Sequence, residues 1–142
     1  MTRGGPTPRI VVMEDNPADV LLIREALREQ GLQASLLVLD DGEAAIEWAS
    51  GKDEAADLIL LDLNLPRHNG QEVLQRIRSQ PRLSHVPVAV FSSSDSLRDR
   101  EETRRLGADR FLVKPCSLDE FLAVGEDIKN MLEAGQRAGA AG

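Results

Sequence analysis

The sequence predicts an α/β fold: a doubly wound (βα)5 parallel sheet of five strands, with helices on both faces. Two observations predict this fold. Five short apolar segments recur along the chain, and helical patterns separate them. Such alternation implies parallel strands joined by right-handed crossovers. The 142 residues suit one domain, which we expect to span 9–134 after a flexible lead-in over 1–8.

The five predicted strands are nearly continuous in Val, Ile and Leu. Strands of a parallel sheet have this composition because helices cover both faces of the sheet. The segments span residues 9–13, 34–39, 57–61, 87–91 and 110–113.

Helix-start and helix-stop signals divide the segments between the strands. Asn16 supplies an N-cap, and Pro17 suits the first helical position because its fixed backbone angle is already helical. Two capping-box patterns start later helices and a Gln-Pro pair ends the third: Asn69 with Glu72, Ser117 with Glu120, and Gln80-Pro81. After about Glu133 the chain is small and polar, so a disordered tail is expected over 135–142.

Composition excludes several classes of protein. Hydrophobic residues make up 42% of the chain and charged residues 29%, which suits a folded domain. The net charge of −7 argues against a nucleic-acid surface, which needs a basic footprint. The single cysteine, Cys116, rules out a disulfide framework, and we expect it to be buried. No apolar run is long enough for a membrane span and no signal peptide is visible, so we expect a cytoplasmic protein.

Polar residues follow four of the predicted strands at the point where each strand ends. Glu14 and Asp15 follow the first strand, Asp62 the third, Ser92 the fourth and Lys114 the fifth. Ligands of open parallel sheets bind at the carboxyl ends of the strands, so these side chains converge if the first and third strands are neighbours. Taken alone, the acid pair could be a solvated turn that benefits from a helix dipole.

The chemistry of this set indicates phosphoryl transfer. Three carboxylates at one edge repel one another, and a divalent cation relieves that repulsion. Hard oxygen ligands without His or Cys favour Mg²⁺ over zinc. A carboxylate is ionised at neutral pH and attacks phosphorus without a general base, which makes Asp62 the candidate nucleophile. Mg²⁺ and the Lys114 ammonium would neutralise the transferring group, and Ser92 could donate a hydrogen bond to it.

With these motifs in this order, the chain resembles the receiver domains of two-component response regulators. The family pattern is matched by the acid pair, the acceptor Asp62, the hydroxyl of Ser92 and the Lys114-Pro115 pair, and "LPRHNG" follows the acceptor. The resemblance covers residues 8–134, nearly the whole chain. It implies a flavodoxin-like, CheY-like sheet with the strand order 2-1-3-4-5.

The resemblance also implies a role for each site residue. Asp15 and Asp62 would bind Mg²⁺ directly, and Glu14 would bind it mainly through water. The backbone carbonyl of Asn64 would be the remaining protein ligand. Ser92 and Phe111 would be the switch residues, and Phe111 lacks the hydroxyl of the tyrosine found at this position in many members. The Lys114–Pro115 peptide bond would be cis.

By this resemblance the protein is a single-domain response regulator that accepts a phosphoryl group from a histidine kinase on Asp62. A narrower similarity, to small stand-alone receivers paired with phytochrome-type histidine kinases, is carried by "VMEDNPADVLLIREAL", "LDLNLPRHNG" and "SSSDS". Phosphorylation would reshape the face formed by the fourth helix, fifth strand and fifth helix, where that group tends to form homodimers. We expect no DNA-binding module, so the output would be contact with a downstream protein or relay to a phosphotransfer protein.

Two other functions remain open from the sequence. A Mg²⁺-dependent phosphatase with an aspartyl nucleophile would use the same chemistry. Enzymes of the haloacid-dehalogenase type, however, carry a second acid two residues after the nucleophile, where this chain has Asn64. A phosphorylation-independent binding module is the other alternative, and the complete acid set argues against it. We expect no enzymatic chemistry beyond self-phosphorylation and self-dephosphorylation.

Overall fold

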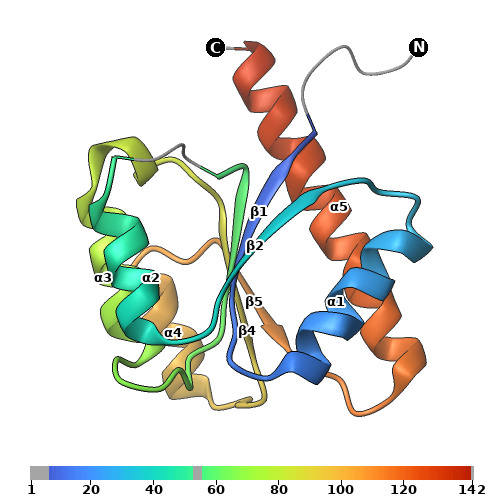
Figure 1. Ribbon diagram of the computed structural model, residues 1–142, viewed down its shortest axis with the longest axis horizontal. Helices are drawn as coiled ribbons and strands as arrows, with labels where there is room; N and C mark the ends of the chain where they lie inside the picture. Colours follow the sequence, from blue (N-terminus) through green and yellow to red (C-terminus); the bar gives the residue numbers. More distant parts are fainter. Residues whose placement is uncertain (1–6, 53–55, 142) are drawn as a thin grey trace.

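The structure is a computed structural model that describes residues 7–52 and 56–141, with side chains described up to residue 135 (Figure 1). Strands and helices alternate along the chain as the sequence predicts. The elements are β1 (Arg9–Met13), α1 (Pro17–Glu29), β2 (Ser35–Leu39), α2 (Gly42–Ser50), β3 (Leu58–Leu61), α3 (Gly70–Ser79), the 3₁₀ turn η1 (Pro81–Leu83), β4 (Val88–Ser92), α4 (Leu97–Arg105), β5 (Arg110–Val113) and α5 (Leu118–Ala141).

The five strands form one parallel sheet in the order β2-β1-β3-β4-β5. The predicted strand order is therefore confirmed, and each strand begins and ends within one residue of its expected bounds. Helices α1 and α5 lie on one face of the sheet, and α2, α3 and α4 lie on the other (Figure 1). Among the helices described, none is both long enough and apolar enough to cross a membrane.

Each face of the sheet has its own core, because successive residues of a strand point to opposite faces. Ile10 and Val12 of β1 belong to one cluster, together with Phe121 of α5. Val11 and Met13 belong to the other cluster, which also contains residues of α2 and α3. Burial on both faces explains why the strand sequences are apolar throughout.

The local helix signals act as predicted. The Asn16 side chain accepts a hydrogen bond of 2.9 Å from the N–H of Ala18, and Pro17 is the first residue of α1. Asn69 and Glu72 form a complete capping box at the start of α3. These caps fix where each chain segment turns away from the sheet edge into its helix.

Three local expectations are wrong. Helix α5 continues past Glu133 to Ala141 instead of giving way to a disordered tail, since the Ala, Gln and Arg residues there have high helix propensity. Cys116 is exposed, because it lies in the loop that leaves the sheet after β5. The Lys114–Pro115 bond is trans, as are all the peptide bonds described; trans is the lower-energy isomer of most such bonds.

Candidate functional site

The carboxyl edge of the sheet brings the predicted polar residues together. Met13 of β1 is in register with Leu61 of β3, so the next residues, Glu14 and Asp62, are neighbours at the edge. The N–H of Asp62 donates to the Met13 carbonyl at 3.0 Å, and this bond extends the pairing of the strands to the acceptor itself.

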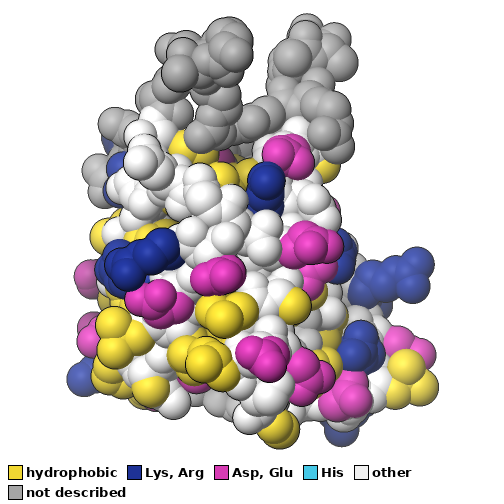
Figure 2. Space-filling model, turned by 90° about the vertical axis from the view of Figure 1, so that its right-hand side faces the viewer, with side chains coloured by type: hydrophobic (Ala, Val, Ile, Leu, Met, Phe, Trp, Pro, Cys, Tyr) yellow, Lys and Arg dark blue, Asp and Glu magenta, His cyan; other side chains and the backbone are white. Residues whose placement is uncertain are grey.

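Three acids gather at this edge. Glu14 and Asp62 are buried, with 3% and 5% of their surface exposed, whereas Asp15 is exposed. One carboxylate oxygen from each of the three lies within 4.8 Å of the others. An arrangement of three hard, negatively charged oxygens, open to solvent on the side of Asp15, fits a divalent cation. Figure 2 shows acidic side chains at the lower right of the face that carries α1 and α5, among hydrophobic and basic ones.

The Lys114 ammonium lies among acids. Its Nζ is 2.9 Å from Oδ2 of Asp62 and 2.8 Å from Oε1 of Glu14. A third partner, Asp19, was not predicted from the sequence, and its Oδ2 accepts a hydrogen bond of 2.8 Å from the same Nζ. The signal for Asp19 was its place in the first turn of α1, because a helix that starts at the sheet edge keeps its first turn beside that edge.

Burial and charge shift the titration of this cluster. Burial is the main cause that raises the pKa of Glu14 from 4.5 to about 7; the hydrogen bond from Lys114 opposes this rise, and the charge of Asp62 adds to it. Burial lowers the pKa of Lys114, but the hydrogen bonds to Asp19, Glu14 and Asp62 outweigh it, so the net pKa lies above the usual value. Lys114 therefore stays charged at neutral pH and neutralises part of the acid cluster.

Backbone groups hold Asp62 in place. Its Oδ1 accepts a hydrogen bond of 2.9 Å from the N–H of Asn64, so the loop after β3 fixes the carboxylate plane. Gly70 allows this loop to fold back, because a Cβ there would lie 2.8 Å from the Asp62 carbonyl and 2.6 Å from Cα of Leu63. The two oxygens of Asp62 thus have different surroundings, one on a backbone N–H and one on Lys114.

Ser92 is the last residue of β4, the strand next to β3, and its side chain is engaged away from Asp62. It is fully buried at the end of β4, and its Oγ accepts a hydrogen bond of 3.1 Å from the N–H of Ser94. Within the described part of the chain, its side chain makes no hydrogen bond to Asp62. A donor role for Ser92 would require its hydroxyl to turn toward the acceptor.

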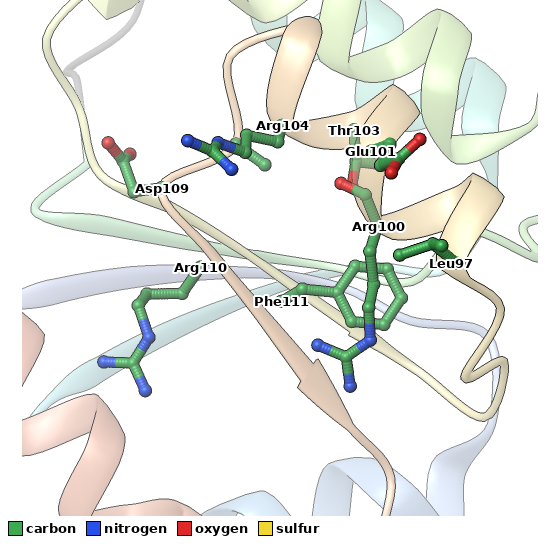
Figure 3. A pocket seen from close by; sticks show the side chains of 9 residues that line it. Leu97, Arg100, Glu101, Thr103, Arg104, Asp109, Arg110 and Phe111 are labelled. Atoms are coloured by element: carbon green, nitrogen blue, oxygen red, sulfur yellow. The ribbon is translucent and has the colours of Figure 1, made fainter.

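Phe111 lies on β5 and is half-buried. The Arg100 guanidinium stacks on its ring, with 4.9 Å from Cζ to the ring centroid, and Figure 3 shows the two side chains together. Arg100 also donates two hydrogen bonds, of 2.8 and 3.1 Å, to Asp95 in the loop before α4. Phe111 and Arg100 line a surface cavity of ≈ 360 Å³ between α4 and β5, with Leu97 and Arg104 also on its wall. The contact to Arg100 was not predicted from the sequence.

The comparisons with known proteins agree with this arrangement. The model of the response regulator receiver domain family matches residues 10–125. Response regulator Rcp1 of Synechocystis sp. is 32% identical over 130 residues, which is 88% of this chain and 88% of Rcp1.

Solved structures show the same similarity. The phosphorylated cyanobacterial phytochrome response regulator RcpA has a TM-score of 0.78 and 33% identity, with 89% of this chain and 94% of that chain covered. The Mn²⁺-bound form of Rcp1 has a TM-score of 0.78 and 32% identity, with coverages of 86% and 91%. The bacteriophytochrome response regulator RtBRR has a TM-score of 0.69 and 32% identity, with coverages of 83% and 75%.

Proposed function

Because the chain belongs to the response regulator receiver domain family, we propose that it is a phosphoacceptor of a two-component phosphorelay, with Asp62 as the residue that a histidine kinase phosphorylates. One observation carries the assignment of the acceptor. Asp62 is a buried carboxylate at the carboxyl edge of the sheet, paired with the Lys114 ammonium at 2.9 Å and flanked by two further acids.

A divalent metal ion, for which we propose Mg²⁺, fits the three acids. Burial raises the pKa of Glu14 to about 7, so the cluster carries more negative charge than the fold readily accommodates. Asp15 and Asp62 would hold the ion directly, Glu14 mainly through water, and the Asn64 carbonyl would add the last protein ligand. When bound, the ion supplies positive charge to the oxygens of the incoming phosphoryl group.

Each side chain at the site has its own proposed role in phosphoryl transfer. Asp62 supplies the carboxylate oxygen that bonds to phosphorus, while the bond from phosphorus to the imidazole nitrogen of the donor histidine breaks. Lys114 holds its ammonium beside Oδ2 and would move onto a phosphoryl oxygen. Ser92 would turn its hydroxyl from Ser94 toward the same group.

The proposed switch links this chemistry to the face formed by α4, β5 and α5. Phosphorylation adds nearly two negative charges at Asp62, which draws Lys114 and Ser92 toward it. Ser92 is the last residue of β4, and the loop that follows carries Asp95, the partner of Arg100. Movement of Ser92 would therefore reach Phe111 and the surface around it.

The proposed partners follow from the relatives. RcpA and RtBRR are named as phytochrome and bacteriophytochrome response regulators, so we propose a phytochrome-type histidine kinase as the donor. The proposed receiver of the signal is a downstream protein, or a phosphotransfer protein, that contacts the α4–β5–α5 face in the cytoplasm. A homodimer through the same face is part of the proposal.

Incubation with acetyl phosphate and Mg²⁺, followed by intact mass measurement, tests the central claim. We expect a single phosphoryl adduct on the wild-type chain, and none on Asp62→Asn or in the presence of EDTA. A wild-type chain without an adduct would refute the assignment.

The two alternatives have their own readouts. The relatives are response regulators, which are signalling proteins, and this does not favour a phosphatase. Turnover of p-nitrophenyl phosphate would support the phosphatase. Binding of a partner with equal affinity before and after phosphorylation would support the phosphorylation-independent module.

A further inference from the structure

Lys114 meets acids from three separate elements of the fold. Its Nζ lies 2.8 Å from Asp19 in the first turn of α1, 2.8 Å from Glu14 after β1 and 2.9 Å from Asp62 after β3. Strand β4 lies between β3 and β5, so the long side chain crosses the end of β4, where Nζ is 5.7 Å from the ring centroid of Phe91. The direction of the side chain therefore depends on the acids at its tip.

Asp19 differs from the other two partners of Lys114. Glu14 and Asp62 belong, with Asp15, to the acids whose oxygens lie within 4.8 Å of one another, and Asp19 is outside this group. The Asp19 side chain is also shielded, with 18% of its surface exposed, so its ion pair is screened less than one at the open surface. Asp19 is thus the acid that stays free to bind Lys114 when the other two take part in the transfer.

We propose that Asp19 is a positioning residue, which holds the Lys114 ammonium at the acceptor while Asp62 is phosphorylated. The inference rests on the proposed function of Asp62. During transfer, the Asp62 carboxylate would form its bond to phosphorus and Glu14 would face the cation site. Neither carboxylate would then hold Lys114 as it does in the resting chain, whereas Asp19 takes part in neither step. Without Asp19, the four-methylene side chain of Lys114 would regain rotamer freedom. Restricting that freedom again during the transfer would cost free energy and slow the reaction.

A purely structural role for Asp19 makes different predictions. An acid in the first turn stabilises a helix through the macrodipole. If this were the whole role of Asp19, its loss would lower the melting temperature and leave the rate of phosphorylation unchanged. A positioning role also changes the rate of phosphorylation and the order of the Lys114 ammonium. Asp119, an exposed acid in the first turn of α5, is the matched control for the dipole effect.

The first experiment measures the rate of phosphorylation by acetyl phosphate at saturating Mg²⁺. We expect Asp19→Asn to be about three- to tenfold slower than the wild type, because a charge-assisted hydrogen bond is lost. Asp19→Glu keeps the charge and should retain most of the rate, whereas Asp119→Asn should match the wild type. A wild-type rate in Asp19→Asn would overturn the proposal.

A double-mutant cycle identifies the route of the effect. If Asp19 acts through Lys114, Asp19→Asn causes no further slowing in a Lys114→Met background. Equal slowing in both backgrounds would overturn the proposal. Lys114→Met leaves buried acids without a counter-charge and risks unfolding the chain, so a second measurement uses single variants only.

That measurement is the ¹⁵N-edited NMR signal of the Lys114 ammonium. We expect slow exchange to make the signal visible in the wild type and in Asp119→Asn, and the signal to be lost in Asp19→Asn. A signal retained in Asp19→Asn would overturn the proposal. A wild-type chain that takes up no phosphoryl group would contradict the function of Asp62 instead, and the ammonium signal would still decide whether Asp19 positions Lys114.

Discussion

The charged side chains at the carboxyl edge of the sheet are stabilised by neighbouring side chains of opposite charge. Glu14 has 2% of its side chain exposed and Lys114 14%, so neither is well solvated, and each compensates the other at 2.8 Å. Burying such groups is costly unless they are paired. The acids at this edge are consequently a source of instability in the absence of a cation, and their ionisation state matters for folding.

The raised pKa of Glu14 predicts a pH-dependent stability. A carboxyl group with a pKa of about 7 in the folded chain, against 4.5 in the unfolded chain, stabilises the fold fully below pH 4.5 and loses that contribution as the pH rises through 7. In EDTA, urea unfolding should show a decline of up to roughly 3 kcal/mol from this group across that window. Glu14→Gln should reduce this pH-dependent loss of stability. Glu43→Gln, at an exposed acid, should leave it unchanged. Identical slopes for wild type and Glu14→Gln would contradict the prediction.

The elements that carry the site are aligned by contacts at a distance from it. Arg78, at the end of α3, donates hydrogen bonds to the carbonyls of Leu83, Val86 and Gly107. These residues precede β4 and β5, so Arg78 fixes where the two strands begin at the opposite edge. On the other face, α1 and α5 approach closely at Gly125, where a Cβ would lie 2.3 Å from the Ala26 carbonyl oxygen.

Substitution of Gly125 tests this helix contact. Gly125→Ala should destabilise the chain by about 1–3 kcal/mol, because backbone atoms of α1 must move to admit the methyl group. Gly135→Ala is the matched control in the same helix, where the nearest atom to a new Cβ is 3.9 Å away in the Pro87 side chain. The control should gain up to about 1 kcal/mol from helix propensity. Urea unfolding measures both variants, and equal stability of the two would count against the close approach.

For the molecule as a whole, the site is an acidic corner on an acidic protein. The chain carries a net charge of −7, and three of its acids lie within 4.8 Å of one another. Binding of a cation to the folded chain alone would therefore shift the equilibrium toward folding by mass action.

Mg²⁺ should raise the melting temperature of the protein for this reason. At a concentration roughly a hundred times the Kd, the gain would be about 2.7 kcal/mol. Asp15→Asn should reduce the gain, since Asp15 is the exposed acid of the cluster. The measurement is thermal unfolding with and without Mg²⁺, with NaCl at matched ionic strength as the control. An unchanged melting temperature at millimolar Mg²⁺ would argue against a shared metal site.

Much of the fold and of the site was predictable, because the signals are local. Apolar runs such as residues 57–61 mark buried strands, and the caps at Asn16 and Asn69 mark helix starts, without reference to distant residues. Acids or a lysine directly after such runs are placed at the carboxyl edge by the topology of parallel sheets. The convergence of Glu14, Asp62 and Lys114 followed from this rule.

The sequence by itself determined the order of the elements and the residues at their ends. Only the tertiary structure decided which of those residues touch. Asp19 and Lys114 are 95 positions apart, and no local pattern couples them. Their contact requires β1, β3, β4 and β5 to lie in their observed order and α1 to start at the same edge. The stacking of Arg100 on Phe111 likewise requires α4 to pack against β5. Side-chain pairing depends on the packing of whole elements, and periodicity along the chain carries no information about it.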